Sequence, residues 1–356
     1  MEIINSMGTG WRMERMITIN RDSGLMLFPF SAEVINSRIR EVLISDNPEV
    51  NEIINYIVEN NGKMVRPRLV MLSSAFYECD SNIVRDVAVA VELIHMASLV
   101  HDDIIDRSLL RRGRQSVNSL WGNQVSVLSG DYLFAAAFQI VNWYGLKAIM
   151  ESITEAIMTM CAGEIKQMSM AYQTVITEEQ YLVKTFEKTA CLFAASCQIG
   201  ALTGAMPADN VQHIKNFGMY LGLAYQIMDD VLDFVSEANL LGKPVGNDLI
   251  QGNITLPIIY ALNEPEVGPW LCNVIETRKF SKSKLQKVSQ ILTEIGAIEY
   301  ATAKSHYFLD KAVEHLCCLP SGAARSELEN LSFYLINDYF EKLQLAGRDK
   351  KQGAFD

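Results

Sequence analysis

Apolar residues recur with a helical period over most of the chain. In residues 88–106 and 213–236 they return every three or four positions, as on the buried face of an amphipathic helix. The same period predicts helices over residues 149–172, 179–204, 284–316 and 324–345. No segment shows sustained alternation of apolar and polar residues, so the sequence does not predict a sheet. We therefore expect an all-α protein.

Short breaks, and no long linker, separate the expected helices. Gly and Pro are sparse, with 21 and 9 in total, and they gather in short stretches between the periodic segments. No Gly-, Ser- or Pro-rich linker and no internal repeat divides the chain. Residues 1–30 are mixed in character and contain several methionines, so we interpret them as an N-terminal extension. Residues 31–356 are expected to form one large helical domain.

Composition narrows the class of protein. The chain has 356 residues, of which 49% are hydrophobic, so it can bury a large core. Its net charge of −11 argues against a nucleic-acid binder, which would carry a basic stripe. The seven cysteines show no CxxC or zinc spacing, and free thiols are typical of the reducing cytoplasm. We find no signal-peptide pattern and no apolar run near the ~18 residues of a membrane span.

Two aspartate clusters lie inside otherwise apolar segments. Their members, three in each cluster, are Asp102, Asp103, Asp106, Asp229, Asp230 and Asp233. In each cluster the first and last residues are four apart, so they project from one helix face. Like charges there are unfavourable in apolar surroundings, and a bound cation would remove the repulsion. Mg²⁺ is usually held by one or two carboxylates together with substrate phosphates and water.

A solvated acidic helix face would account for a single cluster, but two clusters with basic partners favour metal-bound diphosphate. Arg111 and Arg112 follow the first cluster, and Lys63 and Arg66 precede it. Guanidinium groups bind phosphate through paired hydrogen bonds. Each basic residue alone would be a surface charge. Together with Lys188, Thr189 and Lys243 they suggest two diphosphate sites, one reached through Mg²⁺ and one bound directly.

Six motifs, in this order and spacing, resemble those of the trans-type polyprenyl diphosphate synthases. They are NGKMVRP, ELIHMASLVHDDIIDRSLLRRG, GDYLFA, FEKTACLFAASCQIGA, AYQIMDDVLDF and LGKPVGNDLIQGNITLP. The resemblance runs from about residue 32 to residue 345. The HMASLVHDD, AASCQ and GNITLP stretches are similar in particular to the large, catalytic subunits of bacterial heptaprenyl diphosphate synthases.

The resemblance implies a fold, an activity and a role for each matching residue. The fold is a single helical bundle of the isoprenoid synthase type around a central cavity, and the activity is condensation of isopentenyl diphosphate with an allylic diphosphate. The six aspartates correspond to ligands of Mg²⁺. The resemblance implies three Mg²⁺ ions when diphosphate is bound. The residues that correspond to direct contacts with the allylic diphosphate are Arg111, Lys188, Thr189, Gln226 and Lys243. The isopentenyl diphosphate site corresponds to Lys63, Arg66, His95 and Arg112, although His95 alone would be interpreted as a core histidine.

The sequence departs from the family pattern at a few positions. Asn61 and Met64 replace a glycine and an arginine of the usual GGKRxRP, while the key lysine and arginine remain. Asn253 stands where many members have a lysine that contacts the allylic diphosphate, which puts that contact in doubt. Tyr225 replaces the common phenylalanine before Gln226.

Product length depends on the residues one and two turns before Asp102. These are Val91, Ile94, Ala97 and Ser98, and none is aromatic. Small residues there favour a medium or long chain. The resemblance implies an all-trans product of heptaprenyl type, which would serve as a quinone side-chain precursor. Simple helix packing explains Ala97 and Ser98 equally well. A shorter-chain farnesyl or geranylgeranyl diphosphate synthase is the alternative.

Two further alternatives are weaker. A class I terpene cyclase would share the first cluster but carry an NSE-type second metal site. A non-catalytic subunit would lose one or both clusters, and both are intact here. The resemblance implies a dimer, either a homodimer or a heterodimer with a small regulatory subunit. We also expect contact with a membrane surface during product release.

Overall fold

The computed structural model describes residues 31–60, 62–235 and 246–352. Nearly all regular structure in these ranges is helical, which confirms the expected all-α class. The elements are α1 (Ala32–Val42), α2 (Pro48–Glu59), α3 (Val65–Ser74), α4 (Ser81–Ile105), β1 (Leu110–Arg111), β2 (Arg114–Gln115), α5 (Val117–Trp143), α6 (Lys147–Ser169), α7 (Glu178–Thr185), the π-helix η3 (Phe186–Ala190), α8 (Cys191–Thr203), α9 (Ala208–Val235), α11 (Asn247–Ile250), α12 (Leu256–Leu262), α13 (Gly268–Thr277), α14 (Lys282–Glu294), α15 (Ala297–Cys317) and α16 (Ala323–Gln352). Residues 1–30 lie outside the described ranges, so the division at residue 31 stays a prediction.

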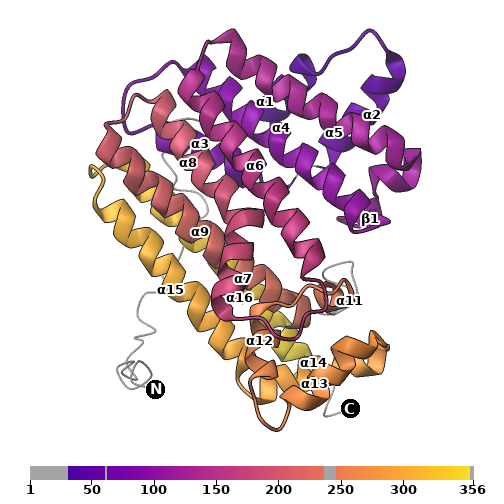
Figure 1. Cartoon of the computed structure of the whole chain (residues 1–356). Coiled ribbons are helices and arrows are strands. Elements are labelled where there is room, and N and C mark those ends of the chain that lie inside the picture. The colour runs from indigo at the N-terminus through magenta and orange to yellow at the C-terminus, as the bar shows by residue number, and fades with distance from the viewer. Residues whose placement is uncertain (1–30, 61, 236–245, 353–356) are drawn as a thin grey trace.

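Two long helices, α4 and α9, carry the aspartate clusters and organise the core. Helix α4 packs along α5, and α9 packs along α15 and α8 (Figure 1). One apolar cluster of buried residues surrounds α8, α9 and α15, and a second surrounds α4 and α5. Gly218 lets α9 approach α8 closely, because a Cβ there would lie 2.6 Å from the carbonyl oxygen of Phe193. Both aspartate clusters therefore lie on helices whose positions are fixed by buried apolar residues.

The start of α4 shows why the sequence forms this helix. The Asp80 side chain accepts a hydrogen bond from the backbone N–H of Asn82 and caps the N-terminus. The apolar residues that follow are buried against α5 and α3. Asp106 is the C-terminal cap, so the first aspartate cluster occupies the last turn of α4.

Three local features differ from the sequence expectation. The segment 284–316 is two helices, because Gly296 adopts a positive φ of 79° and separates α14 from α15. The segment 179–204 contains the π-turn η3 between α7 and α8. A two-residue antiparallel ladder joins β1 to β2, although no sheet was expected. Arg112 and Gly113 form its turn with positive φ at both residues, as tight hairpin turns require.

Helix α5 is the one helix of the described residues that is long and apolar enough to cross a membrane. In its most apolar window, 44% of the residues are buried within the fold. The core helix of a globular protein meets the same criteria of length and composition, so this helix is weak evidence for a membrane span.

Candidate active site

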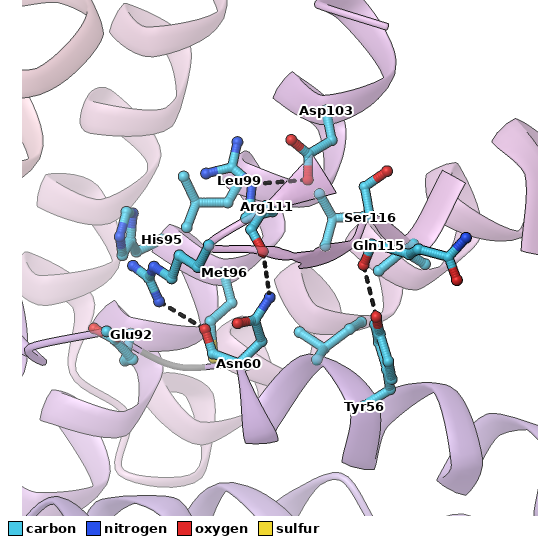
Figure 2. A pocket seen from close by; sticks show the side chains of 15 residues that line it. Tyr56, Asn60, Glu92, His95, Met96, Leu99, Asp103, Arg111, Gln115 and Ser116 are labelled. Carbon is cyan, nitrogen blue, oxygen red and sulfur yellow. Dashed lines mark hydrogen bonds and ion pairs between the residues drawn. The ribbon is translucent and has the colours of Figure 1, made fainter. Parts of the chain in front are cut away.

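The first aspartate cluster divides into two parts at the end of α4. Asp103 is buried, and its Oδ2 accepts a hydrogen bond of 2.8 Å from Nε of Arg111 on β1. Asp102 and Asp106 share the other face of the turn. Arg111 was expected to contact the allylic diphosphate, and the structure pairs it with Asp103 (Figure 2). Asp103 therefore anchors the β1–β2 hairpin beside Asp102 and Asp106, which are half-buried.

Asp102 and Asp106 lie in a site where carboxylates are unfavourable without a cation. Burial raises the pKa of Asp102 to about 6, and repulsion from Glu164 and Asp106 adds to the shift. Burial also raises the pKa of Asp106. Lys188 opposes both shifts, and its Nζ lies 3.2 Å from Oε2 of Glu164 on α6. Lys188 is therefore near the first cluster, as the resemblance implied.

The second cluster is held by a hydrogen-bonded chain that runs from η3 to α7. Thr189 donates to Oε1 of Gln226 at 2.8 Å, and Nε2 of Gln226 donates to Asp230 at 2.8 Å. The hydroxyl of Tyr181 donates to the other carboxylate oxygen of Asp230 at 2.7 Å. Thr189 and Gln226 were both expected at the site, and this chain joins them. It fixes Asp230 in a buried position, whereas Asp229 on the same helix is exposed.

Asp233 connects the second cluster to α11. Its two carboxylate oxygens accept 3.1 Å hydrogen bonds from the backbone N–H groups of Asn247 and Asp248. Burial, with repulsion from Asp248, raises the pKa of Asp233. Asp248 also repels Asp106 and so contributes to the raised pKa in the first cluster. Helix α11 therefore carries negative charge to both clusters. Lys243, the remaining expected contact, lies outside the described residues.

Lys184 contacts Asn253, the residue that replaces the lysine of many family members. Its Nζ donates hydrogen bonds to Oδ1 of Asn253 and, at 3.0 Å, to the carbonyl oxygen of Ile254. The side chain is buried and lies near enough to Asp230 for their charges to interact. A lysine charge thus reaches this part of the site from α7. The π-helix η3 begins two residues after Lys184, and such turns are frequent at functional sites.

Four residues expected to bind the second diphosphate line one pocket. Lys63, Arg66, His95 and Arg112 share it with Glu92, and its volume is about 230 Å³. A water molecule takes up roughly 30 Å³ in the liquid, so the pocket has room for a diphosphate group. Arg112 Nη1 donates to the carbonyl oxygen of Asn60 at 2.6 Å, which holds the hairpin over the pocket. Three cationic side chains and a histidine from separate segments converge here, as an anion site requires.

The donor chemistry fits a divalent metal that is held partly by substrate. Within the described ranges, no three His, Cys, Asp or Glu side chains converge closely enough to hold an ion alone. Magnesium commonly takes one or two carboxylates and completes its shell with phosphate oxygens and water. Asp102 and Asp106 on one side and Asp233 on the other provide hard oxygen ligands of that kind. The residues present therefore fit Mg²⁺ with bound diphosphate.

Sequence reasoning missed five residues that the structure adds to this region. Glu92 lies in the basic pocket, and the others surround the aspartates: Glu164, Tyr181, Lys184 and Asp248. Glu92 is three residues before His95, a spacing that places both on one helix face. Asp248 lies within the last matching motif. Both could have been found from the sequence. Tyr181 and Lys184 had no such signal, because only the packing of α7 against α9 brings them to the site.

Comparison with known proteins assigns the chain to a family. The polyprenyl synthetase family profile matches residues 47–293. The chain is 37% identical over 303 residues to heptaprenyl diphosphate synthase component 2 of Bacillus subtilis, covering 85% of this chain and 86% of the relative. It is 34% identical over 301 residues to octaprenyl diphosphate synthase of Escherichia coli, covering 84% and 93%. The crystal structure of heptaprenyl diphosphate synthase from Staphylococcus aureus is similar with a TM-score of 0.80 at 34% identity, covering 86% of this chain and 96% of that one. This chain therefore belongs to the polyprenyl synthetase family of prenyltransferases.

Proposed function

We propose that this chain is a Mg²⁺-dependent synthase that condenses isopentenyl diphosphate with an allylic diphosphate into a medium- or long-chain all-trans polyprenyl diphosphate of heptaprenyl type. The observation that carries the proposal is the convergence of Lys63, Arg66, His95 and Arg112 on one pocket beside the first aspartate cluster. A condensation of two diphosphates needs one site that binds a diphosphate through basic side chains, next to one that binds the other diphosphate through metal ions. The named relatives, with heptaprenyl and octaprenyl products in their names, support the product class.

The aspartates hold Mg²⁺ in this proposal. Asp102, Asp106, Asp229 and Asp233 would hold the ions, which when bound would supply charge neutralisation for the departing diphosphate. We propose three ions, the number that the family resemblance implies. Protein side chains hold Asp103 through Arg111 and Asp230 through Tyr181 and Gln226, so we propose that each also orients its cluster.

The chain's own cations act on the two diphosphates. Lys188 faces Asp102 and Asp106, so it lies where an allylic diphosphate would meet the first cluster, with Lys243 assigned to the same diphosphate. The basic pocket positions isopentenyl diphosphate so that its double bond can attack the allylic carbon. Buried apolar residues of α4 exclude water from that point, which protects a cationic intermediate. The double bond of isopentenyl diphosphate forms the new carbon–carbon bond as the allylic carbon–oxygen bond breaks, so no side-chain nucleophile is required. The departed diphosphate takes the proton that is lost at the end, so no side-chain base is required.

Product analysis tests the function directly. The purified chain is incubated with isopentenyl diphosphate and Mg²⁺, with each of several allylic primers, and products are identified by mass. We expect polyprenyl diphosphates longer than geranylgeranyl. Product formation from the allylic diphosphate alone would instead indicate a cyclase. Loss of all condensation after chelation of divalent cations is the expected metal control.

Replacing Ala97 by Phe is expected to shorten the product. Ala97 is fully buried on α4, just over one turn before Asp102, so a phenyl ring there would close the path below the aspartates. Product mass measures the shift, and Ala208→Phe at the exposed start of α9 is the control. Overpacking can destabilise a core by about 1–3 kcal/mol, so Ser98→Phe, at a half-buried neighbour, is tested in parallel. If both folded variants keep the wild-type product distribution, this turn is not the floor of the chain path.

We propose that a second subunit binds on the exposed side of α5. Val127, Leu128 and Tyr132 lie on that helix and are exposed, Leu128 to 68%. Exposed apolar groups gathered on one helix face indicate an interaction surface. The partner is a second copy of this chain or a small regulatory subunit, since the Bacillus subtilis relative is named component 2 of its enzyme.

Leu128→Glu is expected to convert the assembly to monomer, because a charge would be buried at the contact. Light scattering after size exclusion measures the mass, and Val175→Glu, at a residue 90% exposed in the α6–α7 loop, is the control. If the wild-type chain alone is monomeric and inactive, the same variant is tested for rescue by a candidate small subunit. An unchanged mass, or rescue equal to wild type, would exclude this face.

The proposed location is the cytoplasm. All seven cysteines are free thiols in the structure, which fits a reducing compartment. The product is a long apolar chain, so we propose that it leaves the enzyme at a membrane surface.

A further inference from the structure

Glu92 is a carboxyl group inside a pocket otherwise suited to an anion. It lies on α4, three residues before His95, and its side chain is 3% exposed. Its Oε2 is buried and has no hydrogen-bond partner among the described residues. Buried ionised groups normally have such partners, so this oxygen requires an explanation. Glu92 and His95 lie together at one end of the adjoining cavity in Figure 2.

The titratable and charged groups that line the pocket with Glu92 come from several parts of the chain. They are Lys63 before α3, Arg66 on α3, His95 on α4, Arg112 in the hairpin turn and Tyr225 on α9. Burial raises the pKa of Glu92 to about 7, although Arg66 and Arg112 oppose the shift. Burial, with repulsion from the same two arginines, lowers the pKa of His95 well below its usual range, so His95 is neutral. Glu92 therefore changes protonation near neutral pH while His95 does not.

A diphosphate in this pocket would bring negative charge against Glu92. A neighbouring anion favours the protonated form of a carboxyl group. A protonated carboxyl group has one O–H donor. Glu92 lines the pocket, and one of its carboxyl oxygens is buried without a partner, so the proton can sit on this group and the donor can be directed at a bound anion. We propose that Glu92 takes up a proton when isopentenyl diphosphate binds and donates a hydrogen bond from it to a diphosphate oxygen. This assignment rests on the proposed function, because it takes the direct diphosphate site as given.

A charged Glu92 that only balances Arg66 and Arg112 is the competing role. In that role its removal would tighten anion binding by the same factor at every pH. In the proposed role the deprotonated form is the one that does not bind. Its population grows as pH rises, so the affinity of the wild-type protein must fall relative to a variant that is always neutral.

Calorimetry of isopentenyl diphosphate binding, without divalent cations, separates these roles. Binding is measured at pH 6 and pH 8 in buffers of different ionisation enthalpy, which gives the number of protons exchanged. Relative to Glu92→Gln, the wild-type protein should take up about one proton at pH 8 and almost none at pH 6. Its relative affinity should fall about tenfold over this range, because only about a tenth of Glu92 is protonated at pH 8. The titration of the ligand itself is common to both proteins and cancels.

Two further variants complete the test. Glu92→Ala lacks a donor and should bind more weakly than Glu92→Gln at both pH values. Glu299→Gln, at an exposed position on α15, should match the wild type in proton number and affinity. Equal proton numbers for the wild type and Glu92→Gln, with binding still lost in Arg66→Gln, would overturn the proposed role of Glu92. The proposed function of the pocket would then still stand. If the wild-type protein binds no isopentenyl diphosphate, the proposed function and this inference both fail.

Discussion

Asp102→Ala is expected to lower the condensation rate by about 10³-fold or more, in proportion to the several kcal/mol that metal-held charge contributes to such a transition state. Asp102 shares a helix face with Asp106, and within residues 31–60, 62–235 and 246–352 no cation lies as close to it as Arg111 lies to Asp103. Removing it leaves Asp106 as the only carboxylate of that face. The effect should appear in turnover at saturating substrate and should not be restored by excess Mg²⁺.

Asp229→Ala should have a comparable effect, since it removes the exposed member of the second cluster. Asp209→Ala, at an exposed position in the first turn of α9, is the matched control and should retain wild-type turnover. Circular dichroism should show an unchanged helical fold in all three proteins, because alanine favours a helix and removes the unfavourable charge of the half-buried Asp102. If either cluster variant keeps near-normal condensation, the assignment of metal ligands is wrong.

The helical pattern predicted the positions of α4, α6 and α9 well, because each buries one continuous apolar face. The pattern failed where a local backbone conformation, such as a positive φ or a tight turn, ends a helix or forms a short ladder. Periodicity continues across Gly296, yet its positive φ ends one helix and starts another. The β1–β2 ladder is too short to produce an alternating pattern, and its turn at Arg112 and Gly113 was visible only as a break.

The candidate site was predictable where charge stands inside an apolar helix. Asp102, Asp106 and His95 share a face of α4, and that spacing follows from 3.6 residues per turn. The pairing of Asp103 with Arg111 was not predictable, because it depends on how the hairpin folds back over α4. Lys184 and Tyr181 were missed for a similar reason: their partners, Asn253 and Asp230, are 69 and 49 residues away in sequence.

Arg66→Gln is expected to raise the KM for isopentenyl diphosphate about 30- to 100-fold, the equivalent of the 2–3 kcal/mol typical of a charge-assisted hydrogen bond. Arg66 lines the basic pocket, and its buried Nε has no hydrogen-bond partner among the described residues. A diphosphate in the pocket would pair with the guanidinium group of Arg66. The KM for the allylic diphosphate should change little, because that substrate meets the aspartates and Lys188 instead.

Steady-state kinetics with each substrate varied in turn measure this split. Arg68→Gln is the matched control, since Arg68 is on the same helix but does not line the pocket. Arg66 also faces Glu92, so Arg66→Gln leaves that carboxyl group with less opposing charge. Adding Glu92→Gln removes this carboxyl group, so it should recover stability, and at pH 6, where Glu92 is mostly protonated, it should leave the KM for isopentenyl diphosphate raised. An equal rise in both KM values would show that Arg66 supports the whole site rather than one diphosphate, and the division into two diphosphate sites would then be wrong.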